Sequence, residues 1–260
     1  MTAIAVFLHA TLLLVLGPPL AGLIRMITRG GGLAAFLEPT LSINSGLRAR
    51  NYPPPHPPPL GPIAALALAF VAGLLIPLFS PDAVLGFLGD GFVALLLLVG
   101  LSARYFTLRA SSVLAVATAL WAIGTLTGST DLGQALANWQ LGLAPLAVFL
   151  ALAAGVAPFM TPETPEEPGS SASGSNDALT SWARSTAQVG WLALGAMAFP
   201  WTIPLTGGAA LAASLAFFVV KIGLLAGFLA FANARWPKLP LAESGFAMAL
   251  LALALVKLGI

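Results

Sequence analysis

The chain has 260 residues, of which 58% are hydrophobic and only 8% are charged, and its mean hydropathy is +0.96. Because soluble globular domains carry about 25% charged residues, this composition excludes an ordinary soluble protein, and a net charge of +2 with scattered basic residues gives no reason to expect nucleic acid. The absence of cysteine excludes disulfides, Fe–S clusters and thiolate metal sites on this chain, and with only His9 and His56 as histidines we expect no metal.

Long apolar runs repeat from one end of the sequence to the other. A helix needs about 20 apolar residues to cross the bilayer core, and in lipid only helices or closed barrels satisfy their backbone groups. The runs are continuous in Leu, Ala and Val and do not alternate with polar residues, so they predict helices. We therefore expect an all-α, polytopic membrane protein forming one integral membrane domain over 1–260. The eight predicted spans are, in chain order, 2–24, 60–79, 84–105, 111–127, 141–160, 182–201, 208–234 and 241–258.

Three connections between the predicted spans have distinctive compositions. The segment 30–62 is rich in Gly and Pro; its part 33–43 is apolar enough to lie on the membrane surface, and a polyproline spacer follows it. The segment 131–140 is polar, with room for a short interfacial helix. The segment 162–180 begins with acidic residues and continues with Ser and Gly, a composition typical of a flexible linker.

The basic residues predict the orientation. Cytoplasmic loops of membrane proteins carry an excess of Lys and Arg. Odd-numbered loops hold nine of the eleven basic residues, and even-numbered loops hold none. Eight spans then place both termini outside a bacterial cytoplasmic (inner) membrane, and we read the first run as a retained span, not as a signal peptide. The nine residues are Arg25, Arg29, Arg48, Arg50, Arg104, Arg109, Arg184, Arg235 and Lys238.

Three of the ionisable residues within predicted spans are candidates for function, because a charge at mid-span costs about 2.5–3.5 kcal/mol. Lys221 lies near the middle of the seventh span, Asp90 about one turn inside the third, and Arg104 at the end of the third. One interpretation is that all three face the bundle interior and belong to a hydrated proton path. The other is that Lys221 snorkels or pairs within the bundle, while Asp90 caps a helix and Arg104 anchors the span at the membrane surface.

Four residues near the predicted cytoplasmic surface are candidates for contact with a partner subunit. They are Glu38 and Arg25 around the first loop, Arg235 after the seventh span, and Glu243 at the start of the eighth; for the carboxylates, simple solvation is the alternative. The sequence has no Walker motif, no GxGxxG opening a helix, no HExxH and no GxSxG. We therefore expect no catalytic residue in this chain.

Short motifs in a fixed order suggest a family. They are LGPPLAGLIR at 16–25, GGL at 31–33, LGD at 88–90, ARYF at 103–106, GST at 128–130, FPW at 199–201, VVK at 219–221, FANAR at 231–235 and GFA at 245–247. With these motifs the chain resembles the membrane subunit that anchors the hydrophilic arm of formate hydrogenlyase and energy-converting hydrogenases. That subunit is similar to the heel subunit that borders the quinone site of respiratory complex I. The likeness covers nearly the whole chain.

The resemblance implies a non-catalytic membrane subunit of a proton-translocating redox complex involved in electron transport. Such a subunit binds a cytoplasmic soluble module on its loops and joins it to antiporter-like subunits within the bilayer. By position, Asp90, Arg104 and Lys221 match polar residues of the family. The chain itself would bind no cofactor, although the family borders a quinone site.

The chain also departs from the family. The family has acidic residues in its fourth span, and 111–127 has none. After the fifth span the family continues with an acidic loop, of which only Glu163, Glu166 and Glu167 remain here. Because those carboxylates supply the family's polar path from the redox site into the membrane, their loss argues against a full proton channel and a conventional quinone pocket. A diverged subunit that keeps its assembly role fits these departures.

Two further hypotheses stay open. One is a stand-alone secondary transporter with Lys221 at its substrate site, although the sequence has no internal repeat of the kind that many secondary carriers show. The other is a purely structural membrane anchor that couples nothing.

Overall fold

The computed structural model describes residues 2–48, 60–76, 91–103, 105–140, 142–160, 174–197, 199 and 208–259, and all the regular elements within them are helices. The prediction of an all-α fold is confirmed. The helices are α1 (Thr2–Arg29), α2 (Gly32–Arg48), α3 (Leu60–Leu75), α4 (Gly91–Ser102), α5 (Ala110–Thr127), α6 (Leu132–Ala137), α7 (Leu143–Val156), the 3-10 turn η1 (Ala157–Phe159), α8 (Gly174–Ala196), α9 (Gly208–Arg235) and α10 (Leu241–Leu258).

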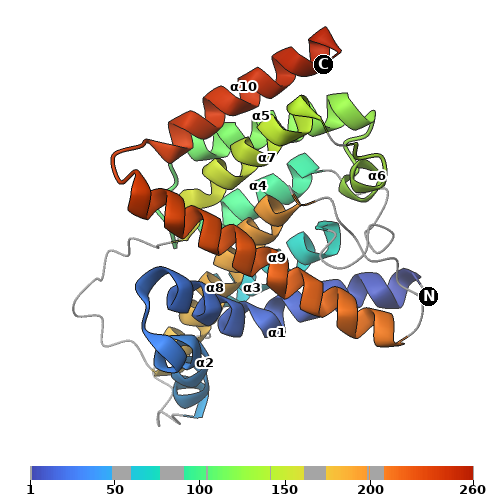
Figure 1. The fold of residues 1–260 in the computed structure, drawn as a ribbon. Helices are drawn as coiled ribbons and strands as arrows, with labels where there is room; N and C mark the ends of the chain where they lie inside the picture. The colour runs from blue at the N-terminus through green and yellow to red at the C-terminus, as the bar shows by residue number, and fades with distance from the viewer. Residues whose placement is uncertain are drawn as a thin grey trace.

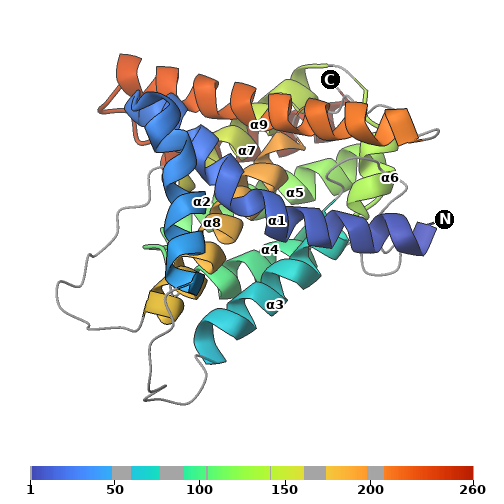
Figure 2. The same ribbon diagram turned by 90° about the horizontal axis from the view of Figure 1, so that it is seen from below.

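The helices form two groups (Figure 1). In one group α5, α7 and α10 pack against one another; in the other, α1 packs against α2, α3 and α8. Figure 2 shows the second group from below, with α1 lying between α2 and α3. Helices α4 and α9 connect the groups, because each contacts members of both. Helix α8 of the second group also does so, because it contacts α7 of the first. The described chain begins and ends at the same end of the bundle, opposite the loop that joins α9 to α10.

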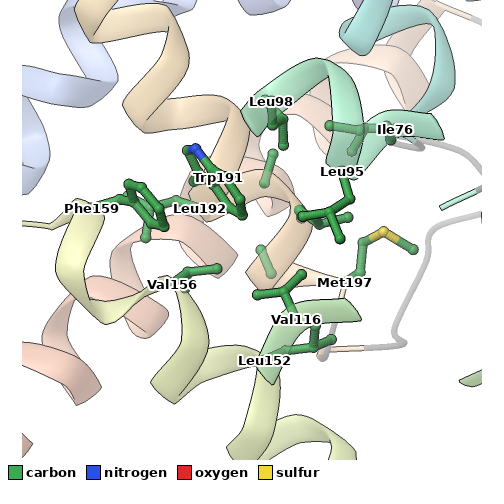
Figure 3. Packing of buried hydrophobic residues seen from close by; sticks show 14 of the residues in the cluster. Ile76, Leu95, Leu98, Val116, Leu152, Val156, Phe159, Trp191, Leu192 and Met197 are labelled. Carbon is green, nitrogen blue, oxygen red and sulfur yellow. The ribbon is translucent and has the colours of Figure 1, made fainter. Parts of the chain in front are cut away.

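Helix α8 forms the centre of the core. Trp191, Leu192 and Leu194 are completely buried, and Figure 3 shows Trp191 and Leu192 among side chains from the helices around them. Helix α8 nevertheless is not among the helices that qualify as membrane spans by length and hydropathy. Its neighbours in the bundle, rather than lipid, surround it, so polar residues such as Thr186 and Gln188 can be buried on it if they are hydrogen-bonded.

Four of the described helices are long and apolar enough to cross a bilayer: Ala10–Arg29, Ala110–Thr127, Ala212–Arg235 and Leu241–Leu258. Three shorter apolar helices, Leu60–Leu75, Gly91–Ser102 and Leu143–Phe159, lie in the second, third and fifth predicted spans. The number of eight spans therefore stays a prediction.

Two connections contain more helix than the sequence suggested. The segment 30–62 contains the 17-residue helix α2, which packs on α1 and α8. The predicted linker 162–180 is wrong over its last seven residues, because α8 already begins at Gly174. Asp177 in the first turn of α8 provides a reason, since a carboxylate there complements the helix dipole. The short interfacial helix expected in 131–140 corresponds to α6, which Asp131 caps by accepting from the N–H groups of Gly133 and Gln134.

The contact between α1 and α2 depends on a glycine. A Cβ atom placed on Gly22 of α1 would overlap the backbone carbonyl oxygen of Phe36 in α2. Only hydrogen at this position lets the two backbones approach so closely. The same principle applies between α7 and α10, where a Cβ on Gly245 would lie 2.9 Å from the Cβ of Ala154.

Candidate functional site

Lys221, the ionisable residue predicted near the middle of a span, faces the interior of the bundle. Its residue surface is 9% exposed, and its ammonium group Nζ donates a 2.7 Å hydrogen bond to the carbonyl oxygen of Phe199. The same nitrogen lies 5.0 Å from the ring centroid of Phe217, one turn earlier on α9, within the range of a cation–π contact. Both contacts favour the charged form of Lys221 at a place where lipid would disfavour it.

Phe199, which accepts from Lys221, lies three residues beyond Ala196, the last residue of α8. Met197 N donates to Leu194 O and Phe199 N donates to Ala196 O, so turns continue past the end of α8. The last carbonyl groups of a helix have no partner within the helix, and they carry the negative end of its dipole. Lys221 thus supplies a positively charged donor from α9 to the segment just beyond the C-terminal end of α8.

Two side-chain hydrogen bonds connect α8 to neighbouring segments. Gln188 donates from Nε2 to the carbonyl oxygen of Met160 at 3.0 Å. Three residues further on, Trp191 donates from its indole Nε1 to the Ser102 hydroxyl at the end of α4 at 2.6 Å. Since the helix rises about 1.5 Å per residue, these bonds follow one another along α8 and connect it to the end of η1 and to α4.

An aromatic cluster surrounds the Trp191 hydrogen bond. The Trp191 ring stacks on Phe159, with ring centroids 4.1 Å apart and an interplanar angle of 4°, as the close-up in Figure 3 shows. Phe106 meets Phe159 edge-on at 5.7 Å. The cluster is therefore a well-packed junction of α8, η1 and the segment after α4, in which the Trp191 indole is hydrogen-bonded.

The three hydrogen bonds at Lys221, Gln188 and Trp191 do not form a continuous chain, because no two of them share an atom. Asp90 and Arg104, the other predicted members of a proton path, lie outside the residues that the structure describes, as do Glu163, Glu166 and Glu167. The sequence analysis considered only ionisable residues as site candidates and therefore missed Gln188, Trp191 and Ser102. The signal that could have indicated Gln188 was its polar amide within an apolar run.

The four candidate partner-interface residues lie at the surface of one end of the bundle, where α1 and α9 end and α10 begins. We call it the loop end. Arg25 and Glu38 contact each other, with 3.4 Å between Nη1 and Oε1, and their side chains are 22% and 62% exposed. Glu243 accepts from the Ser111 hydroxyl at 3.3 Å. Arg235 is the exposed last residue of α9. Within the described part of the chain, no group of three or more His, Cys, Asp or Glu residues lies close enough to hold a metal ion.

Comparison with known proteins gives a likeness in fold. No family model and no curated protein matches the sequence. Among solved structures, the chain is similar to a chain in the structure of the membrane-bound sulfane sulfur reductase (MBS), an archaeal respiratory membrane complex. The two share 19% sequence identity with a TM-score of 0.69, over 96% of this chain and 99% of that one. An end-to-end match at this identity shows a common fold.

Proposed function

We propose that the chain is a membrane subunit of a respiratory redox complex. The observation that carries the proposal is the end-to-end fold likeness to a chain of an archaeal respiratory membrane complex. The likeness covers nearly all of both chains, as expected of subunits that occupy the same place in two complexes. The sequence motifs that resemble the membrane subunit of formate hydrogenlyase and of energy-converting hydrogenases, at 16–25 and 231–235 for example, point to the same kind of complex.

In this proposal the chain links a cytoplasmic module to antiporter-like subunits in a bacterial inner membrane. The end of the bundle with Arg25, Arg109 and Arg235 would face the cytoplasm, in line with the positive-inside tendency. Exposed charges there, Glu38 and Arg235 among them, would contact the soluble module. The apolar outer faces of the helices would contact lipid and the other membrane subunits.

The aromatic cluster around Trp191 is an unfavourable place for a quinone. A quinone headgroup needs free polar groups beside an apolar cavity, and the described polar groups next to the aromatic cluster, Gln188 and Trp191, already bond to Met160 and Ser102. The helices α1 and α8 are also closely packed, since a Cβ on Gly17 would lie 2.7 Å from Thr186 Oγ1. These contacts support the assembly role proposed above.

A purely structural anchor is the second candidate, and the contact of Lys221 favours it. A lysine that donates to the carbonyl oxygen of Phe199 at a helix end already has a structural purpose. An anchor would share the partners of the first proposal and differ from it only in taking no part in proton movement.

Purification of the tagged chain from its native membrane in mild detergent tests the proposal. We expect antiporter-like membrane subunits and a soluble redox module in fixed ratio with the chain. An Arg235→Glu variant should lose the soluble module, whereas Lys257→Glu, the same charge change in the last turn of α10, should retain it. Recovery of the chain alone would contradict the proposal, and transport activity of the chain alone in liposomes would then support the secondary-transporter alternative.

A further inference from the structure

A pocket of about 530 Å³ opens at the loop end of the bundle. Its walls come from the end of α1 at Thr28, the segment before α5, η1, the end of α9 and the start of α10. Ligand pockets in proteins have volumes of about 300–1,000 Å³, so this one has room for a small molecule or for the polar head of a larger one. Lys221, Gln188 and Trp191 are not among its lining residues, although Met160, which accepts from Gln188, is one of them.

The charges around the pocket are positive. Arg109 lines it, and no described residue forms an ion pair with Arg109. No carboxylate occurs among the described lining residues, and Glu243, close by in sequence to the lining residue Ala242, accepts from Ser111. Three more basic residues, Arg29, Arg235 and Lys238, directly follow or lie between lining residues. The pocket is therefore suited to an anion.

The remaining lining residues are of two kinds. Thr107 and Asn233 offer a hydroxyl and an amide donor, while Leu229 and Leu239 are apolar. The hydroxyl of Thr28 already donates to the carbonyl oxygen of Ile24. A free inorganic anion would use only the first kind. A ligand that carries an anionic group next to an apolar part would use both.

The pocket lies at the level expected of lipid headgroups. Three helices that are long and apolar enough to span a bilayer, Ala10–Arg29, Ala212–Arg235 and Leu241–Leu258, begin or end at its walls. Trp236, in the loop between two of them, is 53% exposed and packs edge-on against Phe231. Exposed tryptophan at the end of a span is typical of the membrane–water interface.

We propose that this pocket binds the headgroup of an anionic glycerophospholipid. The phosphate contacts the Arg109 guanidinium and the polar donors beside it, and the glycerol and the first acyl carbons lie on Leu229 and Leu239. Arginine suits a phosphate because its fork of N–H groups can bond two oxygens at once. Basic pockets between membrane helices are a known setting for anionic headgroups. The proposal is independent of the redox complex, because it depends on this chain and the bilayer alone.

Native mass spectrometry of the purified, delipidated full chain tests the proposal. With added phosphatidylglycerol we expect one retained lipid, and at least tenfold less retention of phosphatidylcholine with the same acyl chains. Arg109→Gln should lower phosphatidylglycerol retention about tenfold. Arg48→Gln, the same charge change at the end of α2 and outside the pocket, should leave it unchanged. Equal retention by the Arg109→Gln variant and the unmodified chain would overturn the proposal.

A second variant and a competitor make the test independent of folding defects. Asn233→Asp places a negative charge in the pocket and leaves Arg109 in place, so it should also weaken phosphatidylglycerol retention while the melting temperature stays unchanged. Glycerol 3-phosphate, which lacks acyl chains, should not displace the lipid; displacement would assign the pocket to a small phosphate ester instead. If the Arg109→Gln complex retains its lipid but loses the soluble module, the pocket binds an acidic segment of a partner instead.

Discussion

The ammonium group of Lys221 lies 2.7 Å from the carbonyl oxygen of Phe199 and donates a hydrogen bond to it. Through this bond α9 holds the C-terminal end of α8, the central helix of the core. A lysine within a membrane span usually suggests transport of ions or substrate. Here the same side chain also connects α9 to the segment that follows α8, and experiment can separate the two roles.

Replacing Lys221 by Met and by Gln distinguishes a helix-end contact from a proton-carrying group. Lys221→Met removes the hydrogen bond to the Phe199 carbonyl oxygen, and a hydrogen bond from a charged donor contributes about 1.5–3 kcal/mol. Lys221→Gln keeps a donor but has no titratable proton. If the role is structural, we expect the melting temperature of the purified complex to fall for Met and to stay close to the original for Gln.

The ratio of protons moved to electrons transferred gives the second readout of these variants. With a structural role, the Gln variant assembles and keeps the original ratio. A lower ratio in a fully assembled Lys221→Gln complex would instead show that Lys221 carries protons, and it would contradict the anchor interpretation.

Gly22 allows the close contact of α1 and α2, so substitution by Ala should separate the two helices. The added Cβ would overlap the carbonyl oxygen of Phe36, which is backbone and cannot rotate away. Overpacking of this kind costs about 1–3 kcal/mol, and the melting temperature of the detergent-purified chain should fall accordingly. Gly227→Ala is the matched control, because a Cβ there meets nothing within 4 Å. Equal melting temperatures for the two variants would show that α2 does not pack on α1 in this way.

The bond between Trp191 and Ser102 should appear as a coupling energy. Trp191→Phe removes the indole donor, and Ser102→Ala removes the acceptor. Each variant leaves the other partner of the bond unpaired or creates a small cavity. Because the double variant removes both partners, its loss should be smaller than the sum of the single losses by about 0.5–1.5 kcal/mol. Melting temperatures of the four proteins give the comparison, and strictly additive losses would mean that the bond contributes nothing.

Helix ends that are marked by a proline or a glycine were predictable from the sequence. The predicted span 241–258 matches α10, which follows Pro240 and ends at Gly259 with φ of 70°. The predicted span 111–127 agrees with α5 to within one residue, since Gly128 ends it with φ of 74°. Glycine adopts this left-handed conformation without steric cost, so it marks the end of a helix in the sequence itself.

The parts that depend on contacts between distant segments were not predictable. Hydropathy locates apolar residues and not the polar turns that continue a helix, so the start of α8 was placed eight residues too late. Helix α9 is apolar on all sides, so its sequence did not indicate which face Lys221 occupies or that Phe199, 22 residues away, would be its partner. Arg25 and Glu38 were expected to face a partner subunit, and no sequence pattern indicated that they contact each other.

The predicted topology can be tested with single cysteines, because the chain has none of its own. Ser45 in α2 belongs to the first loop, and Ser129 lies in the connection after α5. Eight spans with both termini outside place Ser45 in the cytoplasm and Ser129 on the other side. We therefore expect a membrane-impermeant maleimide to label a Ser129→Cys variant in intact cells, and a Ser45→Cys variant only after the membrane is permeabilised.

The two labelling results constrain the number of spans between these positions. Opposite sides require an odd number of crossings, which the three predicted spans 60–79, 84–105 and 111–127 supply. Of these, only Ala110–Thr127 is a described helix long enough to cross by itself, while Leu60–Leu75 and Gly91–Ser102 are shorter. Labelling of both variants in intact cells would place the two positions outside, would leave an even number of crossings and would contradict the eight-span topology. A cysteine between the predicted spans 60–79 and 84–105, at Ser80, would then show whether the absent crossing is the one before it or one of the two after it.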